Sequence, residues 1–204
     1  MGRYLEFIKT YRLLHRNSQK HIIFPDACYF VTCKTQGNVP FFRERIFCDL
    51  FVENLRFCKR FKGFLLFGWV LAYDHFHLLV QPGDEWNVSE IMHCLKRNFS
   101  HNANIINGII NPSEGRDNYP GLRFRGMLDK YQQQFIQKHK NQNPYPKFKW
   151  QDKFHDHYIR NENDFDYHME YIEHNQIKHG LPSDWPYIYT NPEYLHQPRI
   201  SRFD

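Results

Sequence analysis

The chain has no apolar run long enough to cross a membrane. The stretch FLLFGWVLAY at 64–73 is well short of the roughly 18 apolar residues that indicate a spanning helix. The first 25 residues are basic and lack the apolar block and cleavage site of a signal peptide. The five cysteines are odd in number and form no CxxC pair. We therefore expect a reduced, cytoplasmic protein with no membrane partner.

Internal repeats and blocks of like charge are also missing, which excludes a repeat architecture and a charged tail. The 204 residues fit one domain, and an aromatic content of 18% excludes a disordered chain. A net charge of +5, spread along the sequence, suits a polyanionic partner without requiring one.

Periodicity in the first half predicts the order strand, helix, strand, strand, helix. ACYFVTCKT at 27–35 reads as a strand, and the apolar spacing over 44–62 as an amphipathic helix ended by Gly63. FLLFGWVLAY and HFHLLVQP form a hairpin, and 88–104 a second helix capped by Ser89 or Asn87. This order begins a ferredoxin-like, split βαβ sandwich of the α+β class, an antiparallel sheet with packed helices.

The remaining segments complete the expected organisation. A strand lies within 149–160, and a helix begins at Asn161 or Asn163 and stops at Gly180. A short helix is expected near 127–138. We expect a basic N-terminal arm, one domain, an insertion within it and a C-terminal tail, at 1–26, 27–188, about 105–148 and 189–204.

The strand HFHLLVQP raises the main chemical question. Because successive side chains of a strand alternate between faces, His75 and His77 share one face, and Phe76, Leu78 and Val80 take the other, which reads as core. Two imidazoles held by rigid backbone are either a metal site or a chance surface pair.

The last helix carries a second polar pattern. Its core stripe is Phe165, Met169 and Ile172, and an offset stripe holds two phenols, an amide and an ammonium: Tyr167, Tyr171, Asn175 and Lys178. Alone, that stripe is equally a solvent-facing surface. With the histidine pair, an asparagine oxygen completes a site for Mg²⁺ or Mn²⁺, and a tyrosine one turn away can attack a bound phosphate.

Longer motifs give a resemblance. YFVTCKT, WVLAYDHFHLLV, WQDKFHDHYIRNENDFDYHMEYIEHNQIKHGL and a following WPY at 185–187 resemble the REP-associated tyrosine transposases, single-tyrosine HUH enzymes that act on single-stranded DNA. The resemblance covers about 27–104 and 148–188. It departs at Gln176, where relatives commonly have proline, and in AYD at 72–74, where many relatives have a Pro-Asn or Pro-Glu pair. The insertion is also longer than the resemblance predicts.

The resemblance implies roles for individual residues. His75 and His77 correspond to metal ligands, Asn175 to the third ligand and Tyr171 to the nucleophile, with Asp156 and His157 in support. The remaining histidines are expected on the surface or in packing: His93, His101, His168, His174 and His179. Candidates for contact with the DNA backbone are basic: Lys96, Arg97, Lys149, Lys153, Arg160 and Lys178.

The implied activity is cleavage and rejoining of DNA at hairpins of palindromic repeats through a 5′-phosphotyrosine, with Mg²⁺ or Mn²⁺ as cofactor. The partner is hairpin or single-stranded DNA, and the enzyme is a monomer or a homodimer. Two alternatives stay open. One is a domesticated nucleic-acid-binding protein that does not cleave; the other is a metal-dependent phosphodiester hydrolase in which water attacks.

Overall fold

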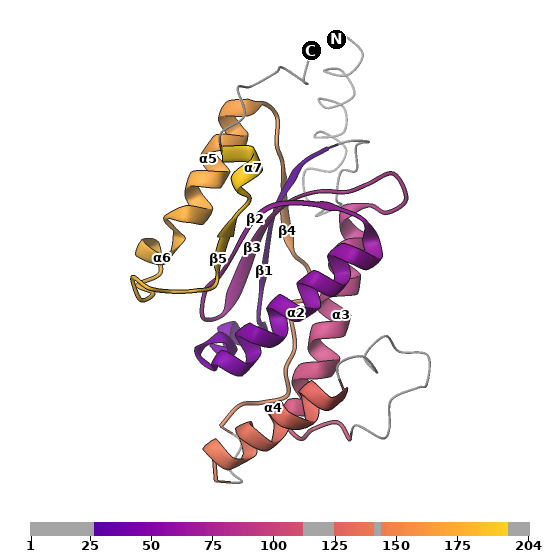
Figure 1. The fold of residues 1–204 in the computed structure, drawn as a ribbon, viewed down its shortest axis with the longest axis vertical. Coiled ribbons are helices and arrows are strands. Elements are labelled where there is room, and N and C mark those ends of the chain that lie inside the picture. Colours follow the sequence, from indigo (N-terminus) through magenta and orange to yellow (C-terminus); the bar gives the residue numbers. More distant parts are fainter. Residues whose placement is uncertain (1–26, 112–124, 141–143, 196–204) are drawn as a thin grey trace.

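The computed structural model describes residues 27–111, 125–140 and 144–195. The arm expected at 1–26 and the last part of the expected tail, 196–204, lie outside the described residues. Within them the chain forms one antiparallel sheet with strand order β4-β1-β3-β2-β5 (Figure 1). The strands are β1 Tyr29–Lys34, β2 Leu65–Leu71, β3 His75–Gln81, β4 His155–Tyr158 and β5 Ile188–Thr190.

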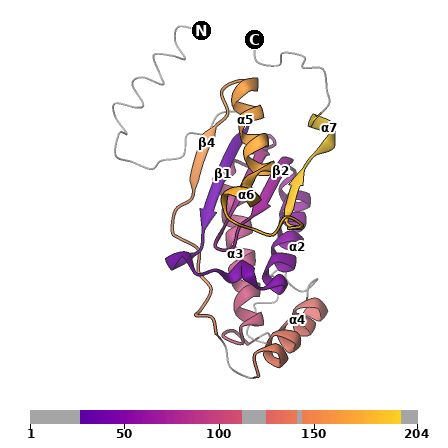
Figure 2. The ribbon, with the colours of Figure 1, turned by 90° about the vertical axis from the view of Figure 1, so that its left-hand side faces the viewer.

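Helices cover both faces of this sheet. Figure 2 shows α5 (Glu162–Glu173) and α6 (Asn175–Lys178) in front of the strands, with α2 (Arg45–Lys62) and α3 (Val88–Ile106) behind them. The larger core joins α2 and α3 to the sheet, and a smaller one joins α5 to its other face. The expected α+β sandwich of an antiparallel sheet with packed helices is confirmed.

Strand alternation divides β3 between the two cores. Phe76, Leu78 and Val80 lie in the larger core, as their spacing predicts. Leu79 belongs to the smaller core, so His75 and His77 share the α5 face with it. The predicted hairpin of β2 and β3 is also confirmed, with Val70 opposite His77.

The two larger helices begin and end as their sequences predict. Gly63 ends α2 in the left-handed region at φ 63°, where glycine has no steric penalty. Asn87 caps α3 by accepting from the Glu90 backbone N–H, while the Glu90 carboxylate accepts from the Asn87 N–H. Phe61, in the last turn of α2, is 56% exposed and stacks on Phe57.

The described part of the insertion packs into the domain. Helix α4 (Arg125–Lys138) lies beside α3 below the sheet in Figure 1 and buries Leu128 and Phe135 in the larger core. Lys138 forms an ion pair with Glu44 at 2.6 Å. Two short 3₁₀ turns, Gln36–Asn38 and Phe41–Arg43, lie between β1 and α2.

The C-terminal region differs from expectation in two respects. The predicted helix from Asn161 to Gly180 is broken at His174, whose φ of −97° and ψ of 5° separate α5 from α6. The predicted cap is present, since Asn161 accepts from the Asp164 N–H, and Gly180 has the predicted positive φ of 59°. Residues 188–190, which span the expected boundary between the domain and the tail, pair with β2 as an edge strand, followed by α7 (Pro192–Leu195).

Within the described ranges, every helix is too short or too polar to serve as a membrane span.

Candidate functional site

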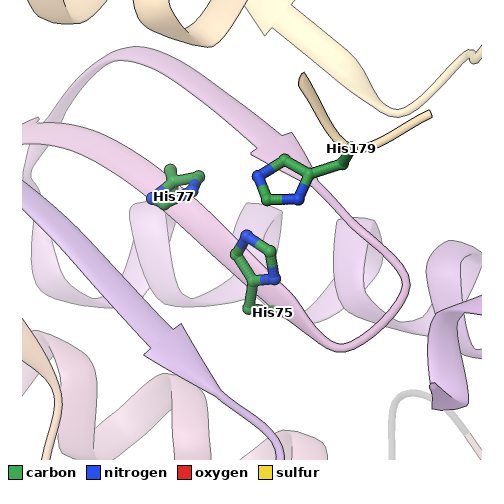
Figure 3. A group of neighbouring side chains, drawn as sticks. All are labelled: His75, His77 and His179. Atoms are coloured by element: carbon green, nitrogen blue, oxygen red, sulfur yellow. The ribbon is translucent and has the colours of Figure 1, made fainter. Parts of the chain in front are cut away.

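Three histidines meet on the α5 face of the sheet. The His75 and His77 rings have centroids 4.9 Å apart, and the His179 ring, just after α6, lies 4.6 Å from that of His75 (Figure 3). One ligand nitrogen from each lies within 4.8 Å of the others. His75 and His77 are each 4% exposed. The group has the donor types and closeness of a metal site.

Hydrogen bonds orient the two strand histidines. The Asp74 carboxylate accepts from His75 Nδ1 at 2.6 Å, and the Thr32 hydroxyl lies 2.8 Å from His77 Nδ1. A carboxylate or hydroxyl partner at one ring nitrogen is the usual support for a metal bond at the other. His77 Nε2 is buried without a hydrogen-bond partner, as a metal-facing nitrogen would be before metal binds.

The environment favours neutral imidazoles. Burial lowers the pKa of His75 and of His179 below the usual value. Burial, with the neighbouring His75 and His179, lowers the pKa of His77 to about 2. Metal binding requires the unprotonated ring, so these nitrogens do not need to lose a proton near neutral pH.

Asn175 is buried at the start of α6. Its side chain is 1% exposed, and neither the amide oxygen nor the amide nitrogen has a hydrogen-bond partner. A buried, unpaired amide is costly unless another group satisfies it. Asn175 and His179 are four residues apart across α6, where the His179 N–H donates to the Asn175 carbonyl. The proposed third ligand therefore fits the chemistry of a metal-binding amide.

The tyrosine expected as nucleophile lies against the histidines. The Tyr171 ring meets the His77 ring edge-on at 5.1 Å and also contacts Phe30. Its hydroxyl accepts a hydrogen bond from Lys178 Nζ at 2.9 Å, and the same ammonium lies 4.4 Å from the ring centre. Tyr167, one turn earlier, is 63% exposed and contacts His168 instead.

A second polar group lies beside the first. Asp164 accepts from His157 at 2.9 Å and approaches His168 Nδ1 at 3.3 Å, and the two imidazoles stack. Phe30 separates this group from the three histidines, because it stacks on His77 on one side and contacts His168 on the other. His157 therefore supports the first turn of α5 and does not join the group of His75, His77 and His179.

Asp156 does not accompany His157. Its partner across the strands is Val31, whose side chain lies in the larger core, whereas His157 pairs with Phe30 on the α5 face. Alternation along β4 directs the two neighbours to opposite faces of the sheet. The two predicted supporting residues, Asp156 and His157, thus lie on opposite faces of the sheet.

Four of the six predicted phosphate contacts lie together elsewhere. A cavity of about 750 Å³ between α3 and the chain at 147–154 is lined by Lys96, Arg97, Lys149 and Lys153. It is on the side of the sheet opposite α5. Lys96 also donates to the backbone carbonyls of Gln151 and Asp152. Arg160 and Lys178 do not line this cavity, and Lys178 contacts Tyr171.

The antiparallel sheet with packed helices, in which a histidine pair faces a helical tyrosine, is the arrangement that the resemblance predicted for the HUH transposase fold. The structure superposes on that of a REP-associated tyrosine transposase bound to a REP hairpin, with a TM-score of 0.58 and 19% identity, covering 84% of this chain and 81% of that one. The chain is also 30% identical, over 118 residues, to a Haemophilus influenzae protein named "Putative REP-associated tyrosine transposase". That match covers 56% of this chain and about half of the relative (52%). No family model matches the chain. The resemblance seen in the sequence is thus confirmed, and the fold is that of the REP-associated tyrosine transposases.

The sequence analysis missed two histidines that lie in these groups. His179 and His168 were expected on the surface or in packing, but each completes a cluster that could hold a metal ion. For His179 a signal was present, since it lies four residues after Asn175 and so returns to the same side of a helical turn.

Proposed function

We propose that the chain is a REP-associated tyrosine transposase that cleaves and rejoins single-stranded DNA at hairpins of palindromic repeats. The observation that carries the proposal is the meeting of Tyr171 with His77, at 5.1 Å between ring centroids, from segments far apart in the sequence. A tyrosine hydroxyl beside orienting imidazoles suits covalent attack on phosphorus.

The proposed ligands of the metal are His75, His77 and Asn175. These residues would hold a divalent ion, Mg²⁺ or Mn²⁺, which would supply polarisation of a phosphoryl oxygen and neutralisation of charge in the transition state. The residues around it do the positioning: Asp74 and Thr32 fix the two rings through their Nδ1 atoms. Each ring therefore presents Nε2 in a fixed direction.

Tyr171 supplies the nucleophilic oxygen. A bond forms between that oxygen and phosphorus, the bond from phosphorus to the 3′ oxygen breaks, and a 5′-phosphotyrosine and a 3′-hydroxyl result. The Lys178 ammonium donates to the tyrosine oxygen at 2.9 Å and therefore favours the negative charge that develops on it. In the reverse step the 3′-hydroxyl attacks and the tyrosine oxygen leaves, so rejoining needs no ATP.

Hairpin DNA is proposed to contact the cavity between α3 and 147–154. Its cationic side chains can neutralise phosphates, which gives affinity without base specificity. The REP hairpin bound in the superposed transposase is the stated ligand of that protein and supports the same class of partner here.

The active site is proposed to be complete within one chain. Within the described chain, Tyr171 contacts His77, His77 contacts His75, and His75 contacts His179, which supports a monomer that cleaves in cis. Mixing a His75→Ala protein with a Tyr171→Phe protein tests this. Recovery of cleavage in the mixture would instead require a homodimer with composite sites.

The central experiment mixes the protein with labelled single-stranded hairpin DNA and Mn²⁺ and separates the products on a denaturing gel. We expect an SDS-resistant protein–DNA band that is lost in Tyr171→Phe and kept in Tyr167→Phe. Cleavage that persists in Tyr171→Phe would favour the hydrolase that uses water. Tight binding without cleavage, across several hairpins, would favour the domesticated binding protein.

A further inference from the structure

We propose that His179 is a direct ligand of the bound metal, so that three imidazoles face the ion, and that this histidine makes the site prefer first-row transition-metal ions over Mg²⁺. The inference rests on the proposed function for the existence of a metal site, and it specifies the ion and a ligand that the sequence pattern does not assign. The ligands that the resemblance implies are His75, His77 and Asn175, and they do not include His179.

The first support is geometric. The His179 ring lies 4.6 Å from the His75 ring at an interplanar angle of 71°, and Figure 3 shows it meeting the strand histidines from the opposite side. Nitrogens bound at about 2.1 Å to one tetrahedral ion lie roughly 3.4 Å apart. The three histidine nitrogens are within 4.8 Å of one another, so small side-chain rotations bring them onto one ion.

The second support is an unpaired nitrogen. His179 Nε2 is buried and has no hydrogen-bond partner, as is also true of His77 Nε2. A buried polar atom without a partner is costly. Two such unpaired nitrogens, on rings of one histidine group, are available to a metal ion.

The other candidate group provides a contrast. In the group of His157, Asp164 and His168, both imidazoles already have hydrogen-bond partners, since the Asp164 carboxylate accepts from His157 and its backbone carbonyl accepts from His168 Nδ1. That group is satisfied by its own hydrogen bonds. The group of three histidines is not.

The local backbone fixes His179 in place. Its N–H donates to the Asn175 carbonyl at 3.1 Å, and the next residue, Gly180, turns the chain with φ 59°. The Leu181 N–H then donates to the Gln176 carbonyl, and the Leu181 side chain is buried. This short α6 segment therefore holds the third imidazole on a defined backbone and not on a free loop.

The number of imidazoles determines which ion fits. Mg²⁺ prefers oxygen ligands and keeps several waters, whereas imidazole nitrogen suits later first-row metals. With His75 and His77 alone plus an amide oxygen, the preference is mixed. A third imidazole moves it toward ions such as Co²⁺ and Zn²⁺.

The test measures metal binding by the full chain without DNA. Co²⁺ is titrated into the wild-type protein while its visible d–d absorption is recorded, and Mg²⁺ is then added in excess as competitor. The variants are His179→Ala and His179→Gln, with His75→Ala as the loss-of-site control. His174→Ala is the matched control, because His174 is exposed and bonds only the backbone of its own helix.

We expect one Co²⁺ per wild-type chain, resistant to excess Mg²⁺. Both His179 variants should bind Co²⁺ at least about tenfold more weakly and release it to Mg²⁺, since removing even a supporting group typically costs 10–100-fold in affinity. His174→Ala should match the wild type. Circular dichroism shows which of the two His179 variants keeps its fold, and the affinities of that variant are compared with the wild type.

A folded His179 variant could bind Co²⁺ as tightly as the wild type and keep it in excess Mg²⁺, while His75→Ala loses Co²⁺ binding. This result would overturn the role of His179 and leave the proposed function standing. Absence of Co²⁺ and Mn²⁺ binding by the wild type would contradict both.

Discussion

The two strand histidines differ in what holds their Nδ1 atoms. Asp74, at the turn before β3, gives His75 a charged partner, whereas Thr32 reaches His77 across the β1–β3 pairing. The second contact depends on register, because Thr32 lies directly opposite His77. A one-residue slip of β1 would turn the hydroxyl to the other face.

Thr32→Val should weaken metal binding about 10- to 100-fold with little loss of fold, because it removes the group that orients His77. Co²⁺ titration of the purified variant measures this change. Thr32→Ser, which keeps the hydroxyl, should bind like the wild type. Equal affinity in the valine variant would show that the hydroxyl does not orient the ring.

The charge of Lys178 predicts a contact with DNA phosphate, but in the structure this side chain contacts Tyr171. Because its ammonium donates to the Tyr171 hydroxyl, Lys178→Met should slow formation of the covalent adduct by about 10²-fold, as for loss of one proton-transfer or charge-stabilising group. Single-turnover rates at saturating DNA measure the effect. Lys153→Met, which removes a charge lining the cavity, should weaken binding but leave the saturated rate unchanged.

At the scale of elements, α5 approaches β2 closely because Gly68 has no side chain. A Cβ there would lie 3.1 Å from Ile172 Cδ1 and 3.1 Å from the Tyr189 carbonyl oxygen. Ile172 is fully buried, so the helix cannot yield by turning this side chain into solvent. The glycine thus sets the depth at which the helix carrying Tyr171 is seated on the sheet.

Gly68→Ala should lower the free energy of unfolding by about 1–3 kcal/mol, the usual cost of overpacking, and should slow covalent adduct formation. Urea denaturation and the SDS-resistant band measure the two effects. Gly126→Ala is the matched control, since Gly126 is exposed in α4 with nothing within 4 Å of an added Cβ. That change should stabilise by about 0.5–1 kcal/mol.

Asp164 joins β4 to the first turn of α5. Burial alone would raise its pKa, but the Arg160 N–H and His157 hydrogen bonds lower the pKa below its usual value. A carboxyl whose pKa is lowered in the folded state stabilises the fold above the unfolded pKa of about 3.9 and loses that contribution as pH falls below it.

Asp164→Asn should therefore destabilise the protein near pH 7 by about 1.5–3 kcal/mol, a typical value for hydrogen bonds to a charged group. The difference between wild type and variant should narrow as pH falls below about 4. Denaturant midpoints across this range measure the trend. A difference that is constant with pH would mean that the carboxylate charge is not the stabilising feature.

At the scale of the whole molecule, the group of His75, His77 and His179 and the cationic cavity beside α3 lie on opposite sides of the sheet. The net charge of +5 favours long-range attraction of a polyanion such as DNA. Some of the positively charged side chains line the cavity. Hairpin DNA that contacts the cavity must pass round an edge of the sheet to reach Tyr171. A stem contacting one side and a single strand reaching the other would meet this requirement.

Lys149→Gln should weaken hairpin binding to a similar degree for all sequences and reduce the slope of log K against log salt by about one unit. Fluorescence anisotropy at several salt concentrations measures the slope. Lys59→Gln removes the same charge from an exposed position on α2 and should leave the slope unchanged. Equal effects of both changes would indicate that net charge alone, not the cavity, attracts the DNA.

The sequence predicted the parts of the molecule in which side-chain periodicity is long and clear. The β2–β3 hairpin, α2 and α3 follow from alternation, apolar spacing and caps over seven or more residues. Strand β5 has three residues, too few for any period, and belongs to the sheet only through pairing with β2. The histidine pair and Tyr171 were found because their spacing is local.

Contacts across the chain were not predictable in this way. Thr32 meets His77 only through strand register, and the cavity forms because Asn104 holds the backbone of Phe148 by two hydrogen bonds. The break at His174 is likewise invisible to a regular 100° period.

The position of the site along the chain affects when activity can appear during synthesis. The hairpin with both strand histidines is complete by residue 81, whereas Tyr171, Lys178 and His179 are translated about ninety residues later. A nascent chain on the ribosome thus carries the imidazole pair for nearly half of its elongation before Tyr171 is made. Premature termination within the insertion would yield a fragment that has the strand histidines but lacks Tyr171, so under the proposed function incomplete copies could not nick DNA.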